Sequence, residues 1–211
     1  MIAILDLGIS NIGSLNQAFQ QVGLHGKLTN SAADIRAAKA VILPGVGAYG
    51  DAMASLRDHG LVEEIRHSAV AGKPLLGICL GMQLLASGST EHGQHGGLDL
   101  VPGQIQRLPE TDHVRVPNIG WCDVTQARPG ALFPKDTEVR GFYFVHSYHF
   151  VPKDPGAVAA TIDSGRETFV AAVETGNIFG VQFHPEKSQD AGLDLLSRYV
   201  SFLRTSGCYE N

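Results

Sequence analysis

The chain carries a thiol, an imidazole and a carboxylate in settings that could assemble into a nucleophilic site. Cys79 lies between glycines in residues 77–81, directly after the apolar run at residues 74–76. His184 and Glu186 follow a second apolar run far downstream. In such a set the imidazole takes the proton of the thiol and later gives it to a leaving group, while the carboxylate orients the ring. The residues therefore indicate acyl-transfer chemistry with a sulfur nucleophile.

The surroundings of Cys79 favour a nucleophile over a packed cysteine. A nucleophile on a sharp strand-to-helix turn needs small neighbours on both sides, and glycines 77 and 81 supply them. A thiol at the first turn of a helix predicted over residues 80–86 would face unpaired N–H groups and the positive end of the helix dipole, which favour the thiolate. An isolated cysteine is more often buried and inert. The strand, the glycines and the helix together reverse that expectation.

The downstream motif supplies the base and the group that orients it. Pro185 restricts His184 to an extended conformation, so the side chains of His184 and Glu186 project from the same side of the chain. A histidine-proline-glutamate tripeptide occurs by chance in many turns. Its value here comes from the pairing with Cys79.

An acyl-transfer site also needs donors for the oxyanion of its tetrahedral intermediate. The backbone N–H of Leu80, after the nucleophile, and that of Val46, in the glycine-rich loop at residues 45–47, fit this role. The loop is equally well explained as a turn that joins a strand to a helix. It lacks the Lys-Ser/Thr pair of a phosphate-binding loop.

The first half of the chain alternates predicted strands with predicted helices. Several of the strands are continuously apolar and do not alternate between apolar and polar residues. This pattern is typical of a mostly parallel sheet covered by helices on both faces. Gly60 interrupts the longest helical stretch. The predicted strands are residues 2–7, 24–29, 40–43 and 74–78, and the predicted helices are residues 12–22, 32–38, 51–71 and 80–86.

The second half is β-rich beyond Gly88 and ends in a helix. We predict β-structure at residues 104–108, 114–124, 141–151, 158–162, 169–174 and 178–183. Leu193, Leu196, Val200 and Leu203 fall on one face of the closing helix, which we expect to pack onto the sheet. The expected fold class is α/β, with a mostly parallel central sheet flanked by helices on both faces and an additional β-rich second half. We expect one domain over residues 1–211.

The composition narrows the classes of function. Of 211 residues, 44% are hydrophobic and 18% charged, and no apolar stretch approaches the ~20 residues of a membrane span. The N-terminal apolar run is interrupted by Asp6, so we expect a buried strand and not a secretion signal. A net charge of −5 without a Lys/Arg cluster argues against nucleic acid as a partner.

The cysteines and histidines outside the proposed site indicate neither a disulfide framework nor a metal site. Cysteines 79, 122 and 208 are odd in number and widely spaced, which predicts free thiols and a cytoplasmic protein. His92 and His95 lie in a glycine-rich loop, where solvated histidines are commoner than ligands. We expect no metal and no cofactor.

Several motifs resemble a known family. GICLGMQ at residues 77–83 and FHPEKS at residues 183–188 resemble the class I, triad-type glutamine amidotransferases. Within that class the similarity is to the glutaminase subunits of imidazole glycerol phosphate synthases, in histidine biosynthesis. The motifs that carry it are PGVGAYGDAM (44–53), NIGW (118–121), FVHSYHF (144–150) and Lys187. The similarity covers nearly the whole chain and implies a flavodoxin-like fold.

The resemblance implies a role for each site residue. Cys79 attacks the side-chain amide of glutamine, His184 protonates the departing ammonia and then activates water, and Glu186 orients the imidazole. Val46 and Leu80 lie next to the oxyanion. The residues that the resemblance assigns to glutamine binding are Gly47, Gln83, His146, Ser147 and Tyr148.

The resemblance also implies a partner. The ammonia passes to a (β/α)8-barrel cyclase subunit in a heterodimer, which makes imidazole glycerol phosphate and an aminoimidazole carboxamide ribotide. The residues matched to the interface are Asn11, Asn118, Trp121 and Lys187. From sequence alone Trp121 fits a core position as well as an interface, and Lys187 fits a solvated surface lysine.

Two departures from the family pattern leave the partner open. Ser10 stands where the family usually has glycine, and Cys122, which we interpret as a packed thiol, stands where it usually has asparagine. Related bacterial pairs deliver ammonia to surface-sugar modification instead. The chain could also be a glutaminase of an anthranilate or pyridoxal phosphate synthase, a noncatalytic scaffold, or a cysteine peptidase or γ-glutamyl hydrolase. The motif at residues 44–53 disfavours the anthranilate and pyridoxal phosphate synthases, and the intact triad disfavours the scaffold.

Overall fold

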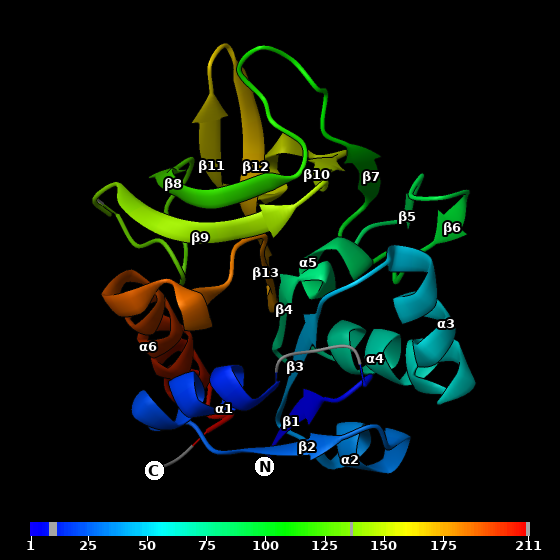
Figure 1. The fold of residues 1–211 in the computed structure, drawn as a ribbon. Coiled ribbons are helices and arrows are strands. Elements are labelled where there is room, and N and C mark those ends of the chain that lie inside the picture. Colours follow the sequence, from blue (N-terminus) through cyan, green and yellow to red (C-terminus); the bar gives the residue numbers. More distant parts are fainter. Residues whose placement is uncertain (9–11, 136, 210–211) are drawn as a thin grey trace.

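A large twisted sheet forms the centre of the protein (Figure 1). Within residues 1–8, 12–135 and 137–209, which this computed structural model describes, the sheet has nine strands. One half of it is parallel. In spatial order its strands are β2 (Gly26–Thr29), β1 (Ile2–Leu5), β3 (Ala40–Gly45), β4 (Leu75–Cys79) and β13 (Ile178–Val181).

The β-rich part extends this sheet and adds a second one. Beyond β13 the pairing is antiparallel, through β12 (Glu167–Thr175), β11 (Val158–Ser164), β8 (Asn118–Gln126) and β9 (Arg140–His146). In the described part of the chain a four-stranded sheet follows the order β10 (Tyr148–Pro152), β7 (Gly103–Arg107), β5 (Gly88–Ser89) and β6 (His95–Gly96). Figure 1 shows β8, β9 and β10 above the end of β4 where α5 begins.

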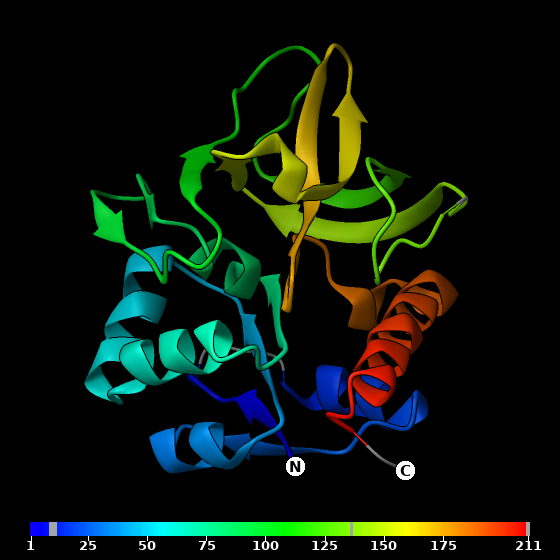
Figure 2. The same ribbon diagram turned by 180° about the vertical axis from the view of Figure 1, so that it is seen from behind.

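Helices cover both faces of the parallel half, as Figure 2 shows from behind. One face packs against α1 (Ile12–Gln21) and α6 (Gln189–Thr205). The other packs against α2 (Ala32–Ala37), α3 (Tyr49–Asp58), α4 (Leu61–Val70) and α5 (Leu80–Leu84). The described residues also form two short 3₁₀ helices, η1 (Pro155–Ala157) and η2 (Pro185–Lys187). None of the described helices has both the length and the apolar character to cross a membrane.

The apolar strands are continuous because both of their faces are buried. In β3, Ile42 joins the hydrophobic cluster under α1 and α6, whereas Val41 and Leu43 join the cluster under the helices of the opposite face. Successive side chains of a strand point to opposite faces, so a strand between two helical layers needs apolar residues at every position. The expected α/β class with helices on both faces is confirmed, and the sheet as a whole is mixed.

The structure moves several predicted boundaries. The run at residues 141–151 divides at Ser147 into β9 and β10, which belong to different sheets. The strand predicted from residue 114 begins at Asn118, after Pro117, which has no N–H for a ladder hydrogen bond. The helix predicted to residue 86 ends at Leu84. Gly60, with φ +65°, divides the long helical stretch where the sequence indicated a break.

Candidate active site

The parallel strands hold Cys79 at the sharp turn that the sequence predicts. It is the last residue of β4 and is followed at once by α5. Its φ of 55° and ψ of −111° lie in a region that non-glycine residues rarely adopt. Because β4 pairs with strands on both sides, the turn is clamped at the carboxyl edge of the sheet. Strained backbone of this kind persists only where the surrounding structure holds it, and it is common at functional sites.

The glycines around Cys79 are required by close backbone approach. A Cβ atom at Gly81 would lie 1.7 Å from the carbonyl oxygen of Leu43. A Cβ atom at Gly77 would lie 2.6 Å from the carbonyl oxygen of Gly81. Neither space admits a side chain, so the two glycines let β4, α5 and β3 come together with the thiol at the turn.

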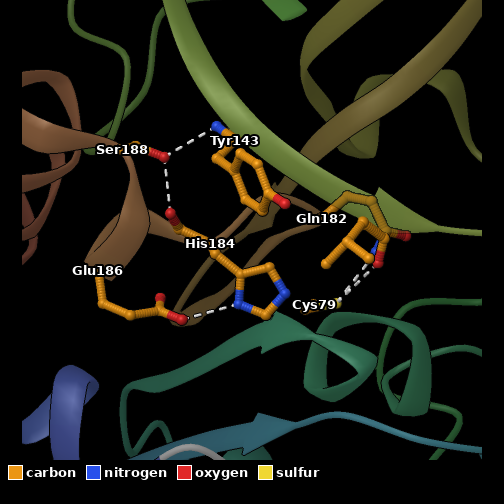
Figure 3. Close-up of polar contacts among 7 residues, drawn as sticks. Cys79, Tyr143, Gln182, His184, Glu186 and Ser188 are labelled. Carbon is orange, nitrogen blue, oxygen red and sulfur yellow. Dashed lines mark hydrogen bonds and ion pairs between the residues drawn. The ribbon is translucent and has the colours of Figure 1, made fainter. Parts of the chain in front are cut away.

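The downstream motif reaches the same place through β13. His184 follows the end of this strand, the parallel neighbour of β4, and adopts an extended conformation with φ −100° and ψ 97°. Its Nδ1 lies 2.8 Å from Oε1 of Glu186, and both side chains are buried, with 4% and 5% of their surface exposed. A carboxylate only accepts hydrogen bonds, so Nδ1 carries a proton. The second ring nitrogen is directed toward Cys79 (Figure 3).

The backbone of His184 is itself anchored to the β-rich part. The Ser188 hydroxyl donates to the carbonyl oxygen of His184 at 2.6 Å and accepts from the N–H of Tyr143 at 3.0 Å. The N–H of His184 donates to the carbonyl oxygen of Tyr143 at 2.9 Å. These contacts, most of them drawn in Figure 3, fix the backbone of His184 and with it the position of the imidazole. The sequence patterns did not identify Ser188, although it ends the FHPEKS motif.

Cys79 and His184 line one pocket and influence each other. Nε2 of His184 has no hydrogen-bond partner among the described residues, and the pocket that it lines also exposes Cys79. Burial by itself lowers the pKa of His184, but the sulfur of Cys79 and the carboxylate of Glu186 outweigh burial and raise the pKa to about 9. The imidazole is therefore protonated at neutral pH, as a group that must give a proton to a leaving amine requires.

The pocket has a volume of about 260 Å³ and is lined by most of the predicted catalytic, oxyanion and glutamine-binding residues. Besides the thiol and the imidazole, the predicted residues that line it are Val46, Gly47, Leu80, Gln83, His146, Ser147 and Tyr148. Glu91, Pro117 and Val145 also line it, and the sequence motifs did not point to them. Glu91 could have been found as the one carboxylate in the glycine-rich loop at residues 87–97. Its Oε2 accepts the N–H of Tyr49 at 2.8 Å.

The two residues that carry the candidate oxyanion donors, Val46 and Leu80, line the same pocket as Cys79. Leu80 is the first residue of α5, and the first N–H groups of a helix have no intrahelical partner. Val46 belongs to the loop after β3, where Gly47 takes a φ of +99°. A Cβ atom at Gly45 would lie 3.1 Å from Cβ of Leu80, so the loop and the turn touch closely.

His146 is a second buried histidine of opposite character. Its Nδ1 lies 2.8 Å from the carbonyl oxygen of Tyr148, and its Nε2 lies 3.1 Å from Nδ2 of Asn118. Burial lowers the pKa of His146 to about 4, so the ring is neutral. A carbonyl only accepts, so the proton is on Nδ1 and Nε2 accepts from the amide of Asn118.

Of the residues matched to an interface, Trp121 in β8 and Lys187 in η2 lie together on an outer surface, whereas the side chain of Asn118 points to the other face of β8, toward His146 and Cys122. Trp121 is 52% exposed and packs its edge on Tyr143 with ring centroids 6.2 Å apart, so it is not a core residue. Nζ of the exposed Lys187 lies 5.8 Å from the centroid of the same ring. Ile119 is exposed beside them. Asn11, matched to the same interface, lies outside the described residues.

The remaining cysteine and histidine predictions can also be located. Cys122 is half-buried against the hydrophobic cluster under α1 and α6, and burial raises the pKa of its thiol. His95 belongs to β6 and packs near Tyr49 with ring centroids 6.4 Å apart. Within the described residues no group of three or more His, Cys, Asp or Glu side chains is placed to hold a metal ion.

Comparisons with known proteins match nearly the whole chain. A family model described as glutamine amidotransferase class-I matches residues 3–198. The chain is 48% identical over 206 residues to the imidazole glycerol phosphate synthase subunit HisH of Moorella thermoacetica, covering 98% of this chain and 97% of the relative. It is 43% identical over 204 residues to the subunit of that name from Syntrophotalea carbinolica, covering 94% and 98%. A crystal structure of glutamine amidotransferase matches with a TM-score of 0.74 at 21% identity, over 98% of each chain, which supports the fold.

Proposed function

Since this chain belongs to the class-I glutamine amidotransferase family, we propose that it hydrolyses glutamine and supplies the ammonia to a synthase. The observation that carries the proposal is the buried His184–Glu186 pair at 2.8 Å, whose imidazole lines the same pocket as Cys79 on its strained turn. Such an arrangement has no evident use in a scaffold, because strain and buried charge both cost stability.

The first half of the reaction forms a thioester. The sulfur of Cys79 attacks the side-chain amide carbon of glutamine, and the N–H groups of Val46 and Leu80 stabilise the oxyanion. Nε2 of His184 gives its proton to the amide nitrogen, the carbon–nitrogen bond breaks, and ammonia leaves. The high pKa of His184 keeps that proton available.

The second half releases glutamate. Once the sulfur is acylated it carries no negative charge, so His184 loses one of the two groups that raise its pKa. The neutral imidazole can then take a proton from water, which attacks the thioester carbon. The carbon–sulfur bond breaks, and glutamate and the free Cys79 thiol remain. Glu186 orients the ring in both halves.

We propose that the α-amino group of glutamine is recognised by Gln83 and Glu91, which line the pocket. Both N–H groups of the Gln83 amide are engaged with protein acceptors, so its oxygen is the atom left to accept from an ammonium group. The carboxylate of Glu91 supplies the opposite charge. The backbone of Ser147 and Tyr148 and Gly47 complete the walls around the substrate.

The synthase that we propose as the partner is the (β/α)8-barrel cyclase of histidine biosynthesis, in a heterodimer. The two HisH relatives carry the name of this synthase's subunit at 43% and 48% identity over nearly their whole length. The exposed surface of Ile119, Trp121 and Lys187 would contact the barrel, and the resemblance to the family adds Asn11 and Asn118 to this interface. The products would be imidazole glycerol phosphate and an aminoimidazole carboxamide ribotide. The free cysteines suit a cytoplasmic protein.

The replacement of Cys79 by serine tests the proposal. In the complex with the barrel subunit, Cys79→Ser should abolish product formation from glutamine and leave product formation from added ammonia unchanged, because only the nitrogen source is lost. Both reactions are followed by the appearance of imidazole glycerol phosphate. If both fail in a folded variant that still binds the barrel, Cys79 is not the nucleophile of a glutaminase. Peptide cleavage by the unaltered chain would instead favour a cysteine peptidase.

A further inference from the structure

Gln182 is a fully buried polar residue that neither the motifs nor the proposed mechanism uses. It lies directly after β13, two residues before His184. Its side-chain amide lies between two residues of the site. Nε2 lies 3.7 Å from the sulfur of Cys79, and Oε1 lies 2.9 Å from Nε2 of Gln83. Figure 3 shows the amide of Gln182 reaching toward Cys79.

The direction of these hydrogen bonds follows from one backbone carbonyl. The carbonyl oxygen of Tyr148 can only accept, and it receives the amide of Gln83 at 3.1 Å. The atom that Gln83 presents is therefore its nitrogen, which donates its second hydrogen to Gln182. The atom that Gln182 presents to Gln83 is then its oxygen, so its nitrogen faces the sulfur of Cys79. Reversing the amide of Gln182 would place two donors against each other.

The same carbonyl is held from the other side. Nδ1–H of His146 also donates to Tyr148, at 2.8 Å. Burial lowers the pKa of His146 to about 4, and the single proton of the neutral ring is on Nδ1 because the Tyr148 carbonyl can only accept, so this donor is present across the physiological pH range. A carbonyl oxygen has two lone pairs, and two donors occupy them here. The carbonyl that sets the direction of the amide chain is therefore fully engaged and cannot turn away.

We propose that Gln182 is a positioning residue that aims an amide N–H at the sulfur of Cys79 and so favours its thiolate. A hydrogen bond to the charged form of a group stabilises that form, more strongly in a buried site. Gln182 and Cys79 are both buried, with 0% and 6% of their surface exposed. Through Gln83 the same amide also connects the sulfur to the residue proposed to hold the substrate. This inference deepens the proposed function and rests on it only for the role of Gln83.

The test is the pH dependence of thiol alkylation in the full chain. The rate of reaction of Cys79 with iodoacetamide is followed by mass spectrometry of the peptide that contains it, because Cys122 and Cys208 are also free. Gln182→Met keeps most of the volume and removes the donor, so the midpoint of the rate profile should rise by about one pH unit. Gln182→Glu can still accept from Gln83 but places a carboxylate beside the sulfur, so its midpoint should rise further.

Asn177 provides the matched control. It lies at the other end of β13 and donates its side-chain amide to the carbonyl oxygens of Ala69 and Lys73 at 2.9 and 2.7 Å. Asn177→Met removes a comparable amide from the same part of the chain and should leave the alkylation midpoint where it is. A role of Gln182 in packing alone predicts no difference between folded Gln182→Met and Asn177→Met, and that result would overturn the proposal.

Alkylation separates the positioning role of Gln182 from the proposed function, because it requires no glutamine and no partner. A raised midpoint in a chain without glutaminase activity would reject the function and retain the positioning role. An unchanged midpoint in a chain that does release glutamate would reject the positioning role alone. Circular dichroism of each variant establishes that the comparison is made between folded proteins.

Discussion

At the scale of single residues, two buried histidines that line the same pocket have opposite character. His146 faces a carbonyl and an amide, and burial lowers its pKa to about 4. His184 experiences the same effect of burial, but Cys79 and Glu186 raise its pKa to about 9. The ring of His146 is thus neutral and only lines the pocket, whereas the ring of His184 can carry a proton. The difference arises from the charge of the neighbours and not from the depth of burial.

The first prediction concerns the alkaline limit of glutaminase activity. His184 has a folded-state pKa above its ordinary value of 6.5, so its proton is present through neutral pH and is lost as the pH rises through about 9. The value of kcat/KM for glutamine should therefore fall near pH 9, because a deprotonated His184 cannot protonate the leaving ammonia. Glu186→Gln removes one of the groups that raise the pKa, so the fall should move to lower pH. Steady-state kinetics across this alkaline limit measure it.

A second buried carboxylate serves as the control for that experiment. Glu174, in β12, accepts the N–H of Ala131 at 2.9 Å and does not line the pocket of Cys79 and His184. Glu174→Gln should leave the position of the alkaline fall unchanged even if it lowers stability. An unshifted profile in Glu186→Gln would show that this carboxylate does not control His184.

At the scale of elements, the thiol turn depends on how closely β3, β4 and α5 approach one another. The contact between Gly81 and the carbonyl of Leu43 brings the start of α5 against β3. The parallel register of β3, β4 and β13 then places the loop of Val46, the thiol and the His184 segment at one sheet edge. Carboxyl ends of parallel strands are the usual place for sites in folds of this type. The chemistry is therefore a consequence of the packing of three neighbouring strands.

The second prediction tests this packing by stability. Gly81→Ala would place a Cβ atom 1.7 Å from the Leu43 carbonyl oxygen, which no side-chain movement relieves. We expect a loss of about 3 kcal/mol in the free energy of unfolding, at the upper end of overpacking effects. Gly13→Ala, in α1, meets no described atom within 4 Å and should not destabilise the protein. Urea denaturation of both variants decides the point, and equal stabilities would contradict the steric argument.

At the scale of the whole molecule, the pocket is built jointly by the parallel half of the large sheet and by the β-rich half of the fold. The parallel half supplies Cys79 and His184, and the β-rich half supplies His146 and Tyr148. The two hydrophobic clusters lie on opposite faces of a sheet that both halves share. We therefore propose that residues 1–211 function as one glutamine amidotransferase domain, which neither half could replace alone.

The third prediction concerns the outer surface around Trp121. An exposed tryptophan packed against Tyr143 is the type of residue that dominates binding energy at protein interfaces. Trp121→Ala should weaken binding of the barrel subunit by about 30-fold, which corresponds to about 2 kcal/mol. Isothermal titration with the purified barrel measures the affinity. Val70→Ser, at the end of α4, removes an 84% exposed apolar side chain and should leave it unchanged. Equal affinities for both variants and the unaltered chain would place the interface elsewhere.

The features that the sequence by itself determined are those set by residues close together along the chain. The alternation of apolar strands and helices predicted the sheet and its covered faces, and the glycines around Cys79 predicted the turn. Each of these is written in a few consecutive residues, because backbone conformation depends on local sterics and on the period of apolar residues. The family motifs then connected Cys79 with His184, which periodicity alone could not do.

The tertiary structure alone decided which distant side chains meet. Gln182 and Cys79 are 103 positions apart in the sequence, and no local pattern indicates their contact. The same holds for the exposure of Trp121 and for the division at Ser147 between two sheets. These features depend on the direction of side chains after the sheets have packed. A hydrogen bond between remote residues is a property of that packing, which the pattern of neighbouring residues does not contain.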